Sequence, residues 1–201
     1  WLIPYVIKGG HFSEISAPLL GFLLVAVGTT VVSHFREIPI WKENSPIRAQ
    51  LQAMITLAVG LCFYLVTMTW LSDENRRITT LKIINFSGGI TLVWSFAQGF
   101  SWLVWNRYPA WMWTFHELYS LGPLFRQRVV GFALEPSWLA HQLNLIFIPF
   151  WLASTVCHFS VHRIRIWKLS LENLFLAGSL VVLGMTFSRI GLLGFLLMIT
   201  Y

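Results

Sequence analysis

Charged residues are scarce in this chain. Of its 201 residues, 11% are charged, 56% are hydrophobic, and the mean hydropathy is +0.67. A soluble domain usually carries about 25% charged residues, so this composition argues against one. The formal net charge of +6 lies in short segments between apolar runs. That pattern is typical of membrane topology, and we therefore expect membrane lipids and no nucleic acid among the partners.

Several motifs that carry chemistry are also missing. The sequence has no P-loop, no dinucleotide fingerprint and no Gly-x-Ser-x-Gly elbow. The six histidines lack the spacing of metal ligands, and His141 and His158 lie about 25 Å apart along one expected helix. The two cysteines, Cys62 and Cys157, lie in apolar runs and are expected to be small core residues. The sequence therefore predicts no metal and no cofactor.

Long runs without formal charge are the main feature that is present. Four of them cover residues 15–35, 49–72, 83–106 and 136–162. Each exceeds the roughly 20 residues that a helix needs to cross a bilayer. A fifth run begins after Glu172 and is interrupted only by Arg189. We expect an all-α, polytopic transmembrane helix bundle with five to six membrane helices, at about 15–35, 49–71, 83–105, 137–160, 171–188 and 190–201.

These helices are expected to form a single transmembrane domain over residues 1–201, joined by an outer loop at 106–136. The chain has no initiator Met and stops at Tyr201 inside an apolar run, so we expect it to be part of a longer protein. The basic loop at 162–168 predicts a cytoplasmic position, which places the outer loop on the opposite side. Within that outer loop, the aromatic segment 107–119 favours a short helix at headgroup level. It serves either as a depth anchor or as a platform for a lipid-linked substrate.

Two arginines are the first candidates for a binding site. A charge inside a membrane is costly, so Arg189, expected near the outer end of the fifth helix, either snorkels to the interface or faces a cavity. Arg128 precedes the fourth helix, and Glu135-Pro136-Ser137 is typical of a helix start. Counting helices places Arg128 and Arg189 on the same side of the membrane. Two guanidiniums near a helix N-terminus predict a cradle for phosphate or pyrophosphate.

Small residues surround Arg189 and are expected to let a helix or an anion approach closely. They are Ser188, Gly191 and Gly194. Glu135 is a candidate general base that activates an acceptor hydroxyl, or a group that orients Arg128. It is equally well interpreted as an acidic residue that compensates the helix dipole. His141 is a weaker candidate for the same catalytic role.

The segments 128–140 and 186–193 together resemble the O-antigen ligase/polymerase superfamily. In that family an Arg-x-x-Gly segment leads into a Pro-containing turn at a helix start, and a Ser-Arg-Gly-like segment follows at the end of the next helix. Here these are Arg128–Gly131 before Pro136, and Ser188-Arg189 before Gly191. The resemblance covers residues 128–194 by motif and the preceding helices by hydropathy only.

This resemblance implies a GT-C-like glycosyltransferase of the bacterial inner membrane. Such an enzyme joins a polyprenyl-pyrophosphate-linked glycan to a growing polysaccharide or a lipid acceptor at the periplasmic face, without a required metal ion. It implies that Arg128 and Arg189 hold the pyrophosphate, and that a further large periplasmic loop lies beyond Tyr201. Two other functions stay open on the residues alone. One is a segment of a polysaccharide or anion transporter or flippase, and the other is a non-catalytic membrane subunit.

Overall fold

The computed structural model describes residues 17–34, 46–162, 164–166 and 169–200. Most of these residues are helical, which confirms the expected helical fold, and one short antiparallel hairpin pairs Arg165 with Ser170. The elements are α2 (Ala17–His34), α3 (Pro46–Leu71), α4 (Glu74–Trp105), α5 (Ala110–Glu117), α6 (Pro136–Gln142), η2 (Leu143–Phe147), α7 (Ile148–Val156), β1 (Arg165–Ile166), β2 (Leu169–Ser170), α8 (Leu171–Met185) and α9 (Arg189–Thr200). The chain divides into two compact units, 1–77 and 78–201.

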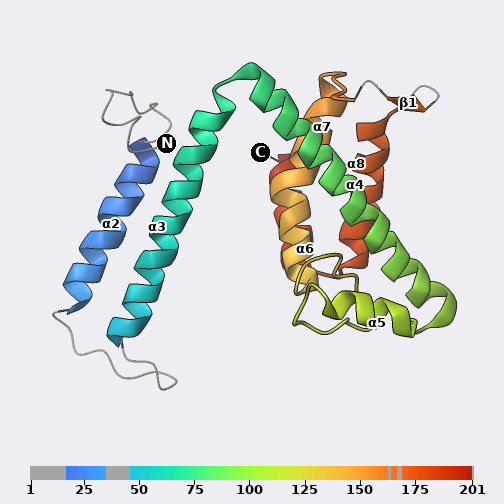
Figure 1. Cartoon of the computed structure of the whole chain (residues 1–201), viewed down its shortest axis with the longest axis horizontal. Helices are drawn as coiled ribbons and strands as arrows, with labels where there is room; N and C mark the ends of the chain where they lie inside the picture. The colour runs from blue at the N-terminus through green and yellow to red at the C-terminus, as the bar shows by residue number, and fades with distance from the viewer. Residues whose placement is uncertain (1–16, 35–45, 163, 167–168, 201) are drawn as a thin grey trace. The chain divides into compact units, whose positions relative to one another are not determined.

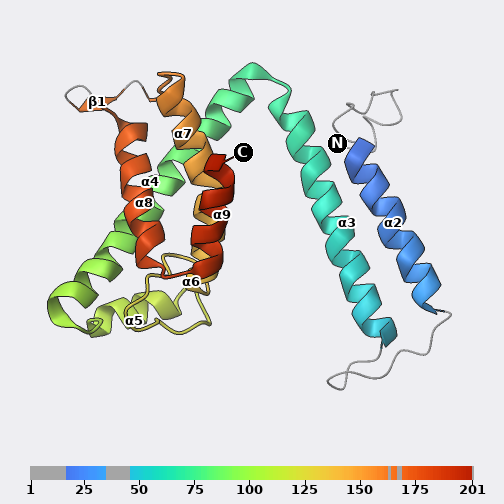
Figure 2. The same ribbon diagram turned by 180° about the vertical axis from the view of Figure 1, so that it is seen from behind.

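In the first unit, α2 and α3 lie side by side and run in opposite directions (Figures 1 and 2). The Gln50 side chain donates a hydrogen bond to Ser33 Oγ at 2.8 Å across this pair. Large apolar side chains are exposed along both helices. Cys62 on α3 and Cys157 after α7 are both exposed. The prediction that these cysteines are core residues is therefore wrong.

Helix α4 begins earlier than the expected boundary at residue 83. The carboxylate of Asp73 accepts a hydrogen bond from the backbone N–H of Arg76 at 2.9 Å, which caps the helix and lets it start at Glu74. The helix ends at Trp105 because Asn106 adopts a left-handed conformation, with φ of 49°. From Ile78 onward, α4 belongs to the second unit.

The expected helix 137–160 is a composite of α6, η2 and α7. Pro149 has no N–H, so the usual hydrogen-bonding pattern fails within this helix, and the preceding turn adopts the wider π-helical register of Leu143–Phe147. The helix starts at Pro136, which occupies the first turn as expected. It ends at Val156 rather than at residue 160, because His158 is left-handed with φ of 51°.

The core of the second unit lies between α4, the α6–η2–α7 helix and α8. Figure 2 shows α9 beside α6 and α7, and Figure 1 shows α5 at the end of the unit where α6 begins. Gly88 on α4 lets the indole of Trp151 pack against the helix backbone, because a Cβ there would lie 2.5 Å from the ring. The fully or nearly fully buried apolar residues include Leu92, Val129, Leu139, Leu143, Phe147, Ile148, Trp151, Val182 and Leu183.

Two helices of the described residues are long and apolar enough to cross a membrane, Ile47–Leu71 and Pro136–Val156. Three further apolar helices are shorter: Gly21–Ser33, Leu171–Met185 and Arg189–Thr200. The bundle of five to six membrane helices stays a prediction, and so does the single transmembrane domain.

Candidate functional site

Arg128 lies against the turn that connects α8 to α9. Its Nε donates a hydrogen bond to the backbone carbonyl of Thr186 at 3.0 Å, and the N–H of Val129 donates to the carbonyl of Met185 at 3.1 Å. The ring of Phe125 lies 6.0 Å from the guanidinium carbon. A guanidinium has five N–H donors, and within the described residues only Nε has a hydrogen-bond partner. The two terminal nitrogens of Arg128 are therefore available to an anion.

Half-buried Arg128 lines a cavity of about 330 Å³. Two of its other wall residues, Gln127 and Phe187, adopt left-handed conformations with φ of 60° and 48°. For residues with a side chain this conformation costs roughly 1–2 kcal/mol, and such strain tends to gather at functional sites. The residues that line the cavity are Gly99, Trp102, Leu103, Tyr108, Gln127, Arg128, Val129, Met185 and Phe187.

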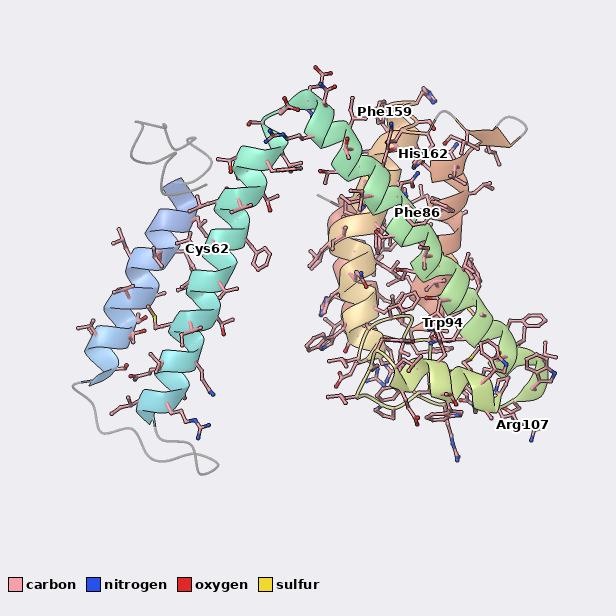
Figure 3. The ribbon with its side chains drawn as sticks, viewed as in Figure 1. Cys62, Phe86, Trp94, Arg107, Phe159 and His162 are labelled. Atoms are coloured by element: carbon pink, nitrogen blue, oxygen red, sulfur yellow. The ribbon has the colours of Figure 1, made fainter. Side chains whose placement is uncertain are left out.

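Two further apolar pockets lie along α4 and share lining residues with this cavity or with each other. The first, of about 430 Å³, shares Gly99, Leu103 and Met185 with the Arg128 cavity. The second, a larger groove of about 730 Å³ between α4, α5 and α8, shares the lining residue Ala97 with the first. Figure 3 labels three residues of this groove, Phe86, Trp94 and His162. We call the two pockets and the cavity together the apolar trough.

The loop that carries Arg128 is held in place by α4. The amide oxygen of Gln98 accepts hydrogen bonds from the N–H groups of Val130 at 3.1 Å and Gly131 at 2.9 Å. Gly131 has φ of 57°, which favours glycine, and a Cβ there would lie 2.9 Å from Ser95 Oγ. Gln98 also donates to the carbonyl of Gly131 at 3.2 Å. These bonds fix the backbone two and three residues after Arg128.

Two tyrosines of the outer loop complete this support. The hydroxyl of Tyr108 donates to two backbone carbonyl oxygens, that of Phe125 at 3.0 Å and that of Arg128 at 3.3 Å. Burial raises the pKa of Tyr108 to about 12, so this phenol stays a neutral donor near pH 7. The hydroxyl of Tyr119 accepts a hydrogen bond from Trp94 Nε1 at 2.7 Å, and burial raises the pKa of Tyr119 as well.

Arg189 does not line the Arg128 cavity. It was expected near the end of the fifth helix, but α8 already ends at Met185 and Arg189 is the exposed first residue of α9. A new helix starts here because Ser188 Oγ accepts a hydrogen bond from the backbone N–H of Gly191 at 3.1 Å and so caps α9. The structure thus brings Arg128 to Thr186, three residues before Arg189 in the chain.

Glu135 and His141 are also exposed and outside the cavity. The carboxylate of Glu135 accepts a hydrogen bond from Ser137 Oγ at 3.2 Å. Its backbone carbonyl accepts the N–H groups of Trp138 and Leu139 at 3.1 and 3.2 Å, so Glu135 is the N-cap residue of α6. The helix-start interpretation of Glu135 therefore matches its surroundings, while its role as a base stays a prediction.

Three groups at this site escaped the sequence analysis: the carbonyl of Thr186, the amide of Gln98 and the phenol of Tyr108. Gln98 had a usable signal, because it is an amide side chain in the middle of the apolar run 83–106, and a buried amide needs hydrogen-bond partners. The other two had none, since a backbone carbonyl and one tyrosine among many aromatic residues carry no pattern.

Comparison of this chain with protein-family models, with curated proteins and with solved structures found no match.

Proposed function

We propose that this chain is part of a membrane glycosyltransferase that moves a glycan from a polyprenyl-pyrophosphate carrier to a polysaccharide or lipid acceptor. In this proposal Arg128 binds the pyrophosphate, Arg189 assists it from the start of α9, and the protein is a polytopic protein of a bacterial inner membrane. The residue pattern shared with the O-antigen ligase/polymerase superfamily is one reason for the proposal.

The arrangement of Arg128 and the apolar trough is the observation that carries this proposal. A carrier lipid consists of a long apolar chain with an anionic head, and it needs an apolar surface that ends at a cation. The pockets of the trough offer apolar surface along α4. Arg128, whose terminal nitrogens have no hydrogen-bond partner among the described residues, lines one of them. Charge-assisted hydrogen bonds from a guanidinium suit phosphate oxygens.

The position of Arg189 also favours an anion. The N-terminal end of a helix carries partial positive charge, so a cation in its first turn is unfavourable unless an anion lies nearby. Arg189 occupies that turn of α9. A pyrophosphate held between Arg128 and α9 would compensate the positive charge of Arg189 and the partial positive charge at the start of α9. Stabilisation that grows as the pyrophosphate leaves would then accelerate transfer.

The test measures transfer of lipid-linked glycan by membranes from a deletion strain that carries the full-length gene. We expect Arg128→Ala to lower the transfer rate by roughly a hundredfold or more, comparable to loss of one transition-state donor. We expect Arg189→Ala to lower it less, because Arg189 lies outside the cavity. Arg128→Lys retains the charge without the guanidinium fork and should restore only part of the rate.

The matched control is Arg126→Ala, because Arg126 is an exposed arginine of the same loop that does not line the cavity. Protein level and membrane insertion are measured for each variant. Full transfer by both Arg128→Ala and Arg189→Ala at normal protein levels would reject the proposal. A non-catalytic subunit or a transporter segment would then be the better interpretation.

A further inference from the structure

We propose that a pocket at the turn between α4 and α5 is a saccharide subsite for the glycan that the transferase moves. This inference rests on the proposed function. The pocket has a volume of about 560 Å³, which lies within the roughly 300–1,000 Å³ of small-molecule sites. Its lining residues are Trp105, Arg107, Tyr108, Pro109, Ala110 and Trp111.

The pocket is formed by a sharp change of chain direction. Asn106 is left-handed, with φ of 49°, and its N–H donates to the carbonyl of Trp102 at 2.9 Å. This residue follows the end of α4, and Pro109, three residues later, is the N-cap residue of α5. Trp105 from α4 and Trp111 from α5 therefore line one concave surface. Figure 3 labels Arg107 at this turn.

The residue types of this pocket match the apolar face and the polar edge of a sugar ring. A pyranose has an apolar face of C–H groups, and the negative face of an aromatic ring attracts such positively polarised hydrogens. The indoles of Trp105 and Trp111 are 53% and 57% exposed, so aromatic surface is free to stack. Arg107 has only donors, which suit the hydroxyl or carboxylate oxygens on the rim of a sugar.

The position of the pocket suits a glycan that is attached to a pyrophosphate. Tyr108 lines both this pocket and the Arg128 cavity. Its hydroxyl is directed to the carbonyls of Phe125 and Arg128, so the side chain forms a fixed wall between the two spaces. A head group at Arg128 would lie one side chain away from the aromatic pocket, and the first sugars would extend towards Trp105.

Exposed tryptophans also occur where a protein only anchors at a membrane interface. Trp138 provides the comparison, because it is 58% exposed in the first turn of α6, at the same end of the second unit. It lines neither the aromatic pocket nor any part of the apolar trough. An anchoring role would affect Trp105 and Trp138 alike, whereas of these two residues only Trp105 lines the proposed saccharide subsite.

The experiment measures saccharide binding to the full-length protein by saturation-transfer NMR, in an amine oxide detergent that has no sugar head group. The probe is the oligosaccharide mixture that mild acid releases from the lipid carriers of the cells that make the protein. We expect transfer to the pyranose C–H protons in the wild type. Trp105→Ala should weaken binding roughly five- to tenfold, as expected for loss of one aromatic contact. Trp105→Phe should restore part of it, and Trp138→Ala should match the wild type.

Absence of saturation transfer in the wild type would overturn the inference. Equal loss in Trp105→Ala and Trp138→Ala would overturn it too, and would identify Trp105 as an interfacial anchor. Arg128→Ala separates this inference from the proposed function, because it should bind the saccharide normally while its transfer rate falls roughly a hundredfold or more. If that variant loses saccharide binding, the sugar lies in the Arg128 cavity instead. If Arg128→Ala and Arg189→Ala both transfer glycan at the full rate, the proposed function fails whatever the binding result.

Discussion

At the scale of single residues, Tyr108 joins the outer loop to the candidate site. Its side chain is 8% exposed, packs against Trp102 and Trp113, and donates to the carbonyls of Phe125 and Arg128. Both contacts require the neutral phenol, because a phenolate has no proton to donate. The protonation state of Tyr108 is thereby linked to the stability of the loop that positions Arg128.

We predict that the protein loses stability between about pH 10 and pH 12, in part through Tyr108. Burial raises the pKa of the folded Tyr108 to about 12 from its ordinary value of 10.0. In this window the unfolded chain releases the proton while the folded chain keeps it, so the free energy of unfolding falls as pH rises. Denaturant unfolding in micelles at several pH values measures this. Tyr108→Phe should show a shallower fall, and a slope identical to that of the wild type would contradict the prediction.

At the scale of elements, the contact between α9 and the α6–η2 helix depends on two glycines. A Cβ on Gly191 would lie 2.3 Å from the Cβ of Ala140, and one on Gly194 would lie 3.3 Å from the side-chain nitrogen of Asn144. That nitrogen donates to the carbonyl of Gly191 at 2.6 Å. The close approach of a helix that the small residues predicted is confirmed. This contact holds α9 against the rest of the second unit.

We predict that Gly191→Ala destabilises the second unit by roughly 1–3 kcal/mol, because α9 must move away from Ala140 to admit the methyl group. Gly184→Ala is the matched control, since no atom lies within 4 Å of a Cβ at that position of α8. The control should be neutral or stabilising by up to about 1 kcal/mol, as alanine favours helices over glycine. Thermal unfolding in micelles compares them. Equal stability of the two variants would show that α9 does not pack closely at Gly191.

At the scale of the whole molecule, the distribution of basic residues predicts the orientation in the membrane. The segment 162–168 is strongly basic, and the turn at 73–77 contains Arg76 and Arg77. Short basic loops stay on the cytoplasmic side. The loop 106–136, which carries Arg128 and the aromatic pocket, is therefore expected outside. The proposed transfer reaction needs this orientation, since its acceptor lies at the outer face.

We predict that alkaline phosphatase fused after Leu121 is active and that the same reporter fused after Leu169 is inactive, because the enzyme matures only outside the cytoplasm. A fluorescent protein at the two positions should give the opposite pattern. The full-length protein should stay in the pellet after an alkaline carbonate wash. A reversed reporter pattern would put the Arg128 site on the cytoplasmic side, and release by carbonate would exclude an integral membrane protein.

The sequence by itself determined the helical fold and the approximate position of each apolar helix. In a bilayer, a long run without charge favours a helix, because every backbone group then finds a partner within its own segment. It also determined the start of α6, since Pro136 suits only the first turn of a helix, and a short helix in the outer loop. The start of α4 was placed too late, because the Asp73 cap lies outside the apolar run.

Only the tertiary structure decided which candidate residues share a cavity. Arg128 reaches it because Gln98, 30 residues earlier, fixes the loop, and because the carbonyl of Thr186, 58 residues later, holds Nε. Arg189 and Glu135 lie outside it, since each is directed by the helix start that it occupies. The physical reason is that hydropathy and helix caps act over a few residues, whereas the orientation of a loop side chain depends on contacts between distant segments.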